Sequence, residues 1–173
     1  AQTPAKTYRI GLLAQYAPTS PQAAHLWGAV LQGMRELGYV EGHNLVIESR
    51  SWGDRVEQVP APADELVRSR VDVIVTGPSP AAEAAKRATS TIPIVMAIHS
   101  DPVTSGLVAT LARPGGNVTG TSTMTPELGG KRLQLLKDVV PRLSRVAVLV
   151  DPTTPMQQLD LRELELAARA LQG

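Results

Sequence analysis

The hydrophobic pattern of the chain predicts β-strands that alternate with amphipathic helices. Short apolar runs and segments of helical periodicity follow one another in the order 8–14, 26–37, 44–52, 64–70, 71–75, 80–89 and 94–98. Several of the strand-length runs are apolar throughout, so these strands are expected to be buried on both faces, as in a parallel sheet. The pattern therefore favours an α/β fold.

The simplest arrangement of these elements is a doubly wound parallel sheet with right-handed crossovers and the strand order 2-1-3-4-5. In this order the first, third and fourth strands are neighbours, and the loops that follow them converge. Open α/β sheets bind their ligands at the carboxyl ends of the strands. We therefore expect the ligand site in the loops after residues 14, 76 and 98.

A second, smaller unit is predicted after this sheet. Residues 118–123 are rich in threonine and interrupted by glycine, which is typical of an edge strand, and we expect Thr121, Ser122 and Thr123 to form a hinge. Helical periodicity over 128–140 and 155–171 flanks an apolar strand-like run at 145–150. That run has no partner strand in the sequence, and strand backbone groups need partners, so the second unit is expected to be incomplete.

These patterns predict the domain organisation. The expected parts are a disordered mature N-terminus at 1–7, a ligand-binding first lobe at 8–120, a hinge at 121–127 and a partial second lobe at 128–173. The small, polar residues 1–6 resemble the start of a protein after signal-peptidase cleavage, which indicates an exported protein.

Composition excludes several classes of function. The chain has 173 residues, 43% of them hydrophobic, and a net charge of +1 without a basic stripe, so nucleic acid is not an expected partner. It has no cysteine, and its three histidines lack metal-ligand spacing, so no metal site is predicted. No G-x-G-x-x-G follows the first strand, and Thr121 stands where a phosphate loop requires lysine, so no nucleotide cofactor is expected.

The turn after the third predicted strand is the strongest candidate for binding chemistry. Ser79 and Pro80 open a helix whose free N–H groups, at Ala81 and Ala82, would suit a carboxylate or another anion. The alternative is that Ser79 only caps its own helix. Tyr16, after the first strand, could also face a ligand.

Asp101 follows the fourth predicted strand and has two possible roles. It could accept a hydrogen bond from a ligand's amino or hydroxyl group, or it could cap the turn formed by residues 103–107.

A serine hydrolase is a further alternative, because Gly77-Pro78-Ser79-Pro80-Ala81 comes within one residue of the nucleophile elbow G-x-S-x-G. Pro80 disfavours that elbow, since a residue before proline is pushed into the extended region. Only His99 follows Ser79 among the histidines, and no acidic residue is placed as a third triad member. Catalysis by Ser79 is therefore not the favoured interpretation.

Several sequence blocks together resemble the ABC-transporter substrate-binding protein family that includes tryptophan- and phenylalanine-binding members. The blocks are LGYVEGHN at 37–44, VDVIV at 71–75, ATSTIPIV at 88–95, DPV at 101–103, LARPGGNVTG at 111–120 and GKRL at 130–133. The resemblance runs from Tyr8 to about Leu171. It implies a type I periplasmic-binding-protein fold, in which two lobes close about a hinge on a small molecule and deliver it to a membrane permease, without catalysis.

The resemblance also implies the site residues and the partners. The turn with Ser79, Pro80, Ala81 and Ala82 would face the ligand together with the loop of His99 and Asp101, while Asp151 and Thr153 would face it from the second lobe. An amino acid or a similar small carboxylate is the expected ligand, without a cofactor, and the periplasm is the expected location. Members of the family continue beyond the position where this sequence stops, so either the chain is a truncated form or a homodimer supplies the missing strands. A ligand-sensing module of a regulator or receptor is the alternative on the same fold.

Overall fold

The structure, a computed structural model, describes residues 6–123, 125–150 and 155–171. The chain divides into two compact units, unit 1 up to Thr121 and unit 2 from Ser122 onward. Each unit is described by itself.

Unit 1 is built on a five-stranded sheet. Its strands are β1 (Tyr8–Ala14), β2 (Leu45–Ser51), β3 (Val73–Thr76), β4 (Ile94–His99) and β5 (Val118–Ser122), in the order β2-β1-β3-β4-β5. β1 pairs in parallel with β2 and β3, and β3 pairs in parallel with β4. The predicted α/β class and the predicted strand order are both confirmed.

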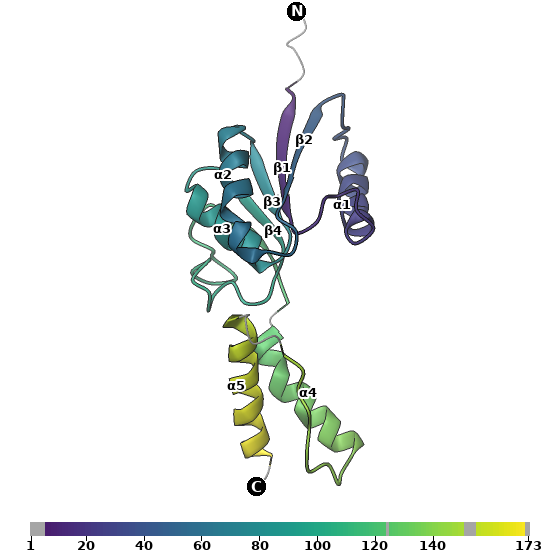
Figure 1. The fold of residues 1–173 in the computed structure, drawn as a ribbon, viewed down its shortest axis with the longest axis vertical. Helices are drawn as coiled ribbons and strands as arrows, with labels where there is room; N and C mark the ends of the chain where they lie inside the picture. Colours follow the sequence, from purple (N-terminus) through teal and green to yellow (C-terminus); the bar gives the residue numbers. More distant parts are fainter. Residues whose placement is uncertain (1–5, 124, 151–154, 172–173) are drawn as a thin grey trace, which may run out of the picture. The chain divides into compact units, whose positions relative to one another are not determined.

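Helices cover both faces of the sheet (Figure 1). α1 (Ala24–Glu36) lies on one side, and α2 (Pro60–Arg68) and α3 (Ser79–Ala88) lie on the other; a 3-10 turn, η1 (Val56–Gln58), precedes α2. Successive residues of a strand point to opposite faces, so the neighbours Leu12 and Leu13 enter two different cores. Leu12 packs in the cluster of Trp27, and Leu13 packs in the cluster of Leu66.

The sequence placed α2 too late, because the helix begins at Pro60 rather than at residue 64. Proline is well suited to this first position, since it has no N–H to leave unsatisfied and its φ is already helical. The two prolines at 60 and 62 are therefore part of the helix.

Unit 2 contains two helices that lie side by side, α4 (Thr125–Val139) and α5 (Pro155–Ala170). Their approach is close where α4 carries glycine: a Cβ added at Gly130 would lie 3.3 Å from the Cβ of Ala167. The strand predicted at 145–150 is wrong for this structure, because no strand is assigned there within the described residues. A strand needs a paired neighbour, and in its described part unit 2 offers two helices.

Candidate functional site

The carboxyl ends of β1 to β4 meet along one edge of the sheet. The parallel registers place Ala14 beside Ser51, Leu13 beside Thr76, and Thr76 beside Met96. The loops that leave these strands are 15–16, 52–54, 77–79 and 100–101, and we call this edge with its four loops the carboxyl edge. Tyr16, Ser79 and Asp101 therefore lie along the same edge, in loops that follow neighbouring strands.

Ser79 is joined to the next loop and does not cap its own helix. Its Oγ lies 3.3 Å from Oγ of Ser100 and accepts a hydrogen bond from the Ser100 N–H, also at 3.3 Å. The first turn of α3 shows no side-chain cap, and Pro78 stands at the N-cap position. The result is a pair of partly buried hydroxyl groups that bridges the loops after β3 and β4. Ser100 was missed from the sequence, although it follows β4 as Ser79 follows β3.

The two alanines of this turn have a different place from the predicted one. Ala81 and Ala82 are fully buried in the core of unit 1. The Ala81 N–H donates to the carbonyl of Pro78 at 2.9 Å, so the prediction that this group is free for a ligand is wrong. Pro80 has no N–H, and it is half-buried at the start of the helix. Ser79 therefore carries the polar chemistry of the turn.

His99 lies in the interior, at the end of β4. The residue is 1% exposed, its Nδ1 accepts the Asp101 N–H at 3.1 Å, and its Nε2 lies 3.9 Å from Oε1 of Glu83. Burial lowers the pKa of His99 below its ordinary value, and the nearby charge of Asp101 opposes this shift only in part. The neutral ring therefore holds the backbone of the loop in place, which differs from the direct ligand contact that the resemblance implied.

Asp101 caps the turn that follows β4. Its Oδ1 accepts the N–H groups of Val103 at 3.1 Å and of Thr104 at 3.0 Å. Burial pushes the pKa of Asp101 upward, but the hydrogen bonds from Thr104 and Val103 outweigh it and leave the pKa below its ordinary value. Of the two roles considered for Asp101, the structure supports the cap.

Tyr16 is held by a residue that the sequence analysis did not single out. The Tyr16 hydroxyl donates to Oδ1 of Asp54 at 2.6 Å, and this hydrogen bond is the main reason why the pKa of Tyr16 is raised. The Gly53 N–H also donates to the carbonyl of Gln15 at 2.8 Å, so the loops after β1 and β2 are tied together twice. The available signal for Asp54 was its place two residues beyond the strand predicted at 44–52.

The remaining predicted residues belong to the junction and to the second lobe. Thr121 donates from its hydroxyl to the carbonyl of Ala97, which ties the end of unit 1 to β4. Ser122 is the last residue of β5, and Thr123 follows it. Their role as a hinge stays a prediction, and Asp151 and Thr153 lie outside the described residues.

Ser79 does not have the backbone conformation of a nucleophile elbow. A nucleophile elbow holds its serine at positive φ, whereas Arg70 is the only non-glycine residue described with positive φ. Ser79 is a helical residue whose hydroxyl meets Ser100, and the described bond of His99 Nδ1 goes to a backbone N–H.

The described residues hold neither a metal cluster nor a membrane-spanning helix. The ranges 6–123, 125–150 and 155–171 hold no group of three or more acidic, histidine or cysteine side chains suited to a metal ion. Within the same ranges, no helix has both the length and the apolar character that a membrane crossing requires.

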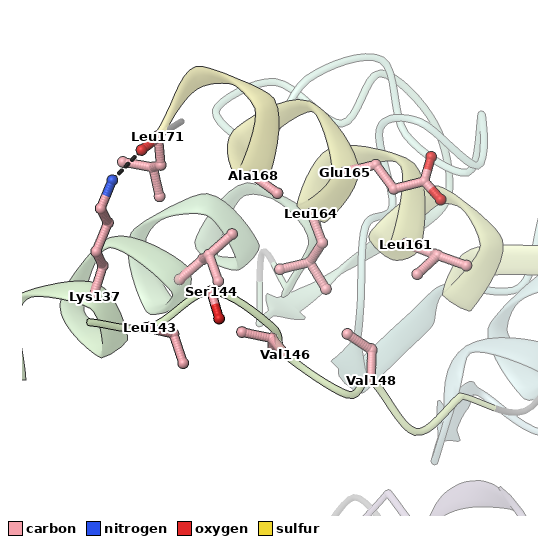
Figure 2. Close-up of a pocket in the computed structure, with 11 residues that line it drawn as sticks. Lys137, Leu143, Ser144, Val146, Val148, Leu161, Leu164, Glu165, Ala168 and Leu171 are labelled. Atoms are coloured by element: carbon pink, nitrogen blue, oxygen red, sulfur yellow. Dashed lines mark hydrogen bonds between the residues drawn. The ribbon is translucent and has the colours of Figure 1, made fainter. Parts of the chain in front are cut away.

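A large apolar groove lies within unit 2, and none of the residues that line it was predicted to bind ligand. Figure 2 shows it between α4, α5 and the segment after α4. Its volume is about 720 Å³. Its lining includes Leu133, Leu143, Val146, Val148, Leu161 and Leu164. Lys137 closes one end of it by donating to the carbonyl of Leu171. Leu149, which follows the lining residue Val148, is fully exposed.

Comparison with known proteins identifies the family. The profile of a family described as ABC transporter substrate binding protein matches residues 20–171. A tyrosine-binding protein of Clostridioides difficile is 31% identical over 134 residues, which cover 78% of this chain and 38% of that protein.

Solved structures agree with this result. A conserved domain protein of Vibrio cholerae matches with a TM-score of 0.82 at 29% identity, over 95% of this chain and 54% of the other. A domain from Streptococcus pneumoniae in complex with L-Trp matches with a TM-score of 0.81 at 25% identity, over 96% of this chain and 55% of the other. This chain thus spans about half the length of these solved relatives. With the family profile matched over most of its length, the chain belongs to the ABC transporter substrate-binding protein family.

Proposed function

We propose that this chain is the solute-binding component of an ABC importer and that it captures an amino acid or a similar small carboxylate at the carboxyl edge. The observation that carries the proposal is the hydroxyl pair of Ser79 and Ser100, which lies between the loops after β3 and β4. Family membership supports the class of function, and the pair supports the site. The permease, the periplasmic location and closure about residues 121–123 follow from the family and are part of the proposal.

The chemistry of the hydroxyl pair suits a carboxylate. Both contacts of Ser79 with Ser100 are long, 3.3 Å, so a charged acceptor can replace them with shorter bonds. The pair lies at the N-terminus of α3, a ten-residue helix whose dipole favours a negative charge there. Asp101 does not compete strongly with such a ligand, because its Oδ1 is already bound by two backbone N–H groups.

The choice of an amino acid rests on the relatives. One is named a tyrosine-binding protein, and another was solved with L-Trp. L-tyrosine and L-tryptophan are therefore the first ligands to test against this chain.

Titration calorimetry with L-tyrosine and L-tryptophan tests the proposal. Ser79→Ala removes a hydroxyl that would donate to a charged group, so we expect binding to weaken about 10- to 100-fold. Ser105→Ala is the matched control, because Ser105 is exposed in the turn after β4 and no hydrogen bond of its hydroxyl is described. Equal affinity of Ser79→Ala and the parent chain, or no binding of either amino acid, would contradict the proposed site.

We also propose that two copies of this chain associate through unit 2. The groove of about 720 Å³ is lined mainly by apolar side chains, and the adjoining segment 145–150 carries the exposed Leu149 without an assigned strand in the described structure. Pairing of this segment with a second copy would satisfy its backbone groups and cover the apolar surface.

A ligand-sensing module of a regulator or receptor, built on the same fold, stays an alternative role for the chain.

Light scattering over a range of protein concentrations tests the association. A dimer that is lost in Leu149→Lys but kept in Leu166→Lys is the expected result. Leu166 is the matched control, since it is 59% exposed on α5 and does not line the groove. A chain that stays monomeric at every concentration would show that a second copy does not cover this surface.

A further inference from the structure

Asp54 is an exposed carboxylate at the carboxyl edge whose direction is fixed by its neighbours. The Tyr16 hydroxyl donates to its Oδ1 at 2.6 Å, and the preceding Gly53 N–H donates to the carbonyl of Gln15 at 2.8 Å. Tyr16 itself packs against the core cluster under α1, so the position of its phenol ring is fixed by the core. The loop after β2 is thereby held at a constant position beside the loop after β1.

The charge of Asp54 is not neutralised in the described part of the chain. Among the described residues no lysine, arginine or histidine pairs with it, and no hydrogen bond to its Oδ2 is found. Asp101 is the carboxylate that the sequence placed at this edge. Its Oδ1 accepts hydrogen bonds from the N–H groups of Val103 and Thr104. Of these two carboxylates, Asp54 is the one with an oxygen open to a cationic group.

The strand order places the loops that carry Asp54 and Ser79 two strand spacings apart along the edge. β2 and β3 lie on opposite sides of β1, and each is one strand spacing away from it. The backbones of β2 and β3 are therefore about 10 Å apart. Asp54 and Ser79 each come three residues after the end of their strand. A ligand that bridges this spacing would make one hydrogen bond of about 2.8 Å at each end. About 4 Å would then remain between the two polar groups of the ligand. A carboxylate and an ammonium on one carbon atom match that separation.

We propose that Asp54 binds the ammonium group of an amino-acid ligand whose carboxylate lies at Ser79 and Ser100. This inference rests on the proposed function and adds the residue that distinguishes amino acids from plain carboxylic acids. Tyr16, which follows the intervening strand β1, is the positioning residue that holds the Asp54 carboxylate toward the ligand.

Calorimetry with two matched pairs of probes tests the assignment. The pairs are L-tyrosine with 3-(4-hydroxyphenyl)propanoate, and L-tryptophan with indole-3-propanoate; each acid lacks only the ammonium group. Asp54→Asn removes a charge-assisted bond, so it is expected to weaken the amino acids about 10- to 100-fold and to leave the two acids within about twofold. Asp64→Asn is the matched control, because it makes the same charge change at an exposed position of α2.

Tyr16→Phe separates positioning from general damage to the fold. It keeps the ring that packs against the core and removes only the hydroxyl that orients Asp54. We expect a smaller loss for the amino acids, about three- to tenfold, and again little change for the two acids. Unchanged tryptophan fluorescence of both variants would show that unit 1 stays folded.

The outcomes are distinct. Amino acids that bind the parent chain and Asp54→Asn equally would overturn the role of Asp54 and leave the proposed function standing. Acids that bind while amino acids do not would also overturn it, since no ammonium group would then be recognised. Failure of all four probes to bind the parent chain would overturn the proposed function and this inference together.

Discussion

Asn117 holds the helix and the strand that present Ser79 and Ser100, and its replacement should destabilise unit 1. Its Nδ2 donates to the carbonyls of Ile92 at 2.8 Å and Thr89 at 3.1 Å, and its Oδ1 accepts from Nζ of Lys86 at 2.9 Å. One side chain thus joins the C-terminal end of α3 to the segment that enters β4.

The expected cost of Asn117→Ala follows from these three bonds. Each is worth about 1 kcal/mol net, and the carbonyl of the largely buried Thr89 loses a partner that water replaces poorly. We expect a loss of about 3 kcal/mol in the free energy of unfolding of unit 1. Lys86→Met removes only one of the three bonds, so it should cost about 1 kcal/mol or less.

Urea unfolding followed by tryptophan fluorescence measures this loss. The two tryptophans of the chain, Trp27 and Trp52, are both buried in unit 1, so their emission reports on that unit. At a slope of about 2 kcal/mol per molar urea, Asn117→Ala should lower the midpoint by about 1.5 M. A midpoint within about 0.3 M of the parent chain, or equal to that of Lys86→Met, would refute the reasoning.

Three further predictions use the same fluorescence assay. The pKa of His99 is lowered in the folded chain, so the unfolded chain binds the proton more tightly. The contribution of His99 to the free energy of unfolding is therefore fully present above about pH 6.5 and falls as the pH drops below that value. His99→Gln should flatten this pH dependence. Gly120→Ala should lower stability by about 3 kcal/mol or more, because its Cβ would lie 2.1 Å from the carbonyl oxygen of Met96 at φ +141°. Leu66→Ala, at a fully buried position, should cost about 2 to 5 kcal/mol, whereas Leu37→Ala, 75% exposed, should change stability by less than about 0.5 kcal/mol.

The fold of unit 1 could be predicted from sequence because its signals are local. Runs such as 8–14 and 94–98 are apolar on both faces, which fits strands covered by helices on each side. The segment 145–150 shows where this reasoning stops. Its composition also favours a strand, but strand formation depends on a partner, and the hydrophobic pattern of one segment carries no information about its partner.

The candidate site could be predicted as a place but only partly as a set of residues. Strand order fixes which loops meet, so the sequence alone places Tyr16 and Ser79 at one edge of the sheet. The sequence could not indicate which hydrogen bonds each side chain makes once it is there. The sequence allows Ser79 to cap its own helix, but its hydroxyl meets Ser100 instead, and His99 is buried.

The exchange of roles between Asp101 and Asp54 follows from where each carboxylate finds N–H groups. Asp101 precedes a proline and a tight turn, and that turn delivers two backbone N–H groups to its own side chain. Asp54 follows Gly53, whose positive φ of 72° turns the chain so that the described partner of its carboxylate is the hydroxyl of Tyr16 on another loop. A carboxylate satisfied by its own turn gains little from a ligand, whereas one held by a single neutral donor keeps most of its charge for a cation. The local turn therefore decides which of the two carboxylates at this edge is bound by its own backbone N–H groups.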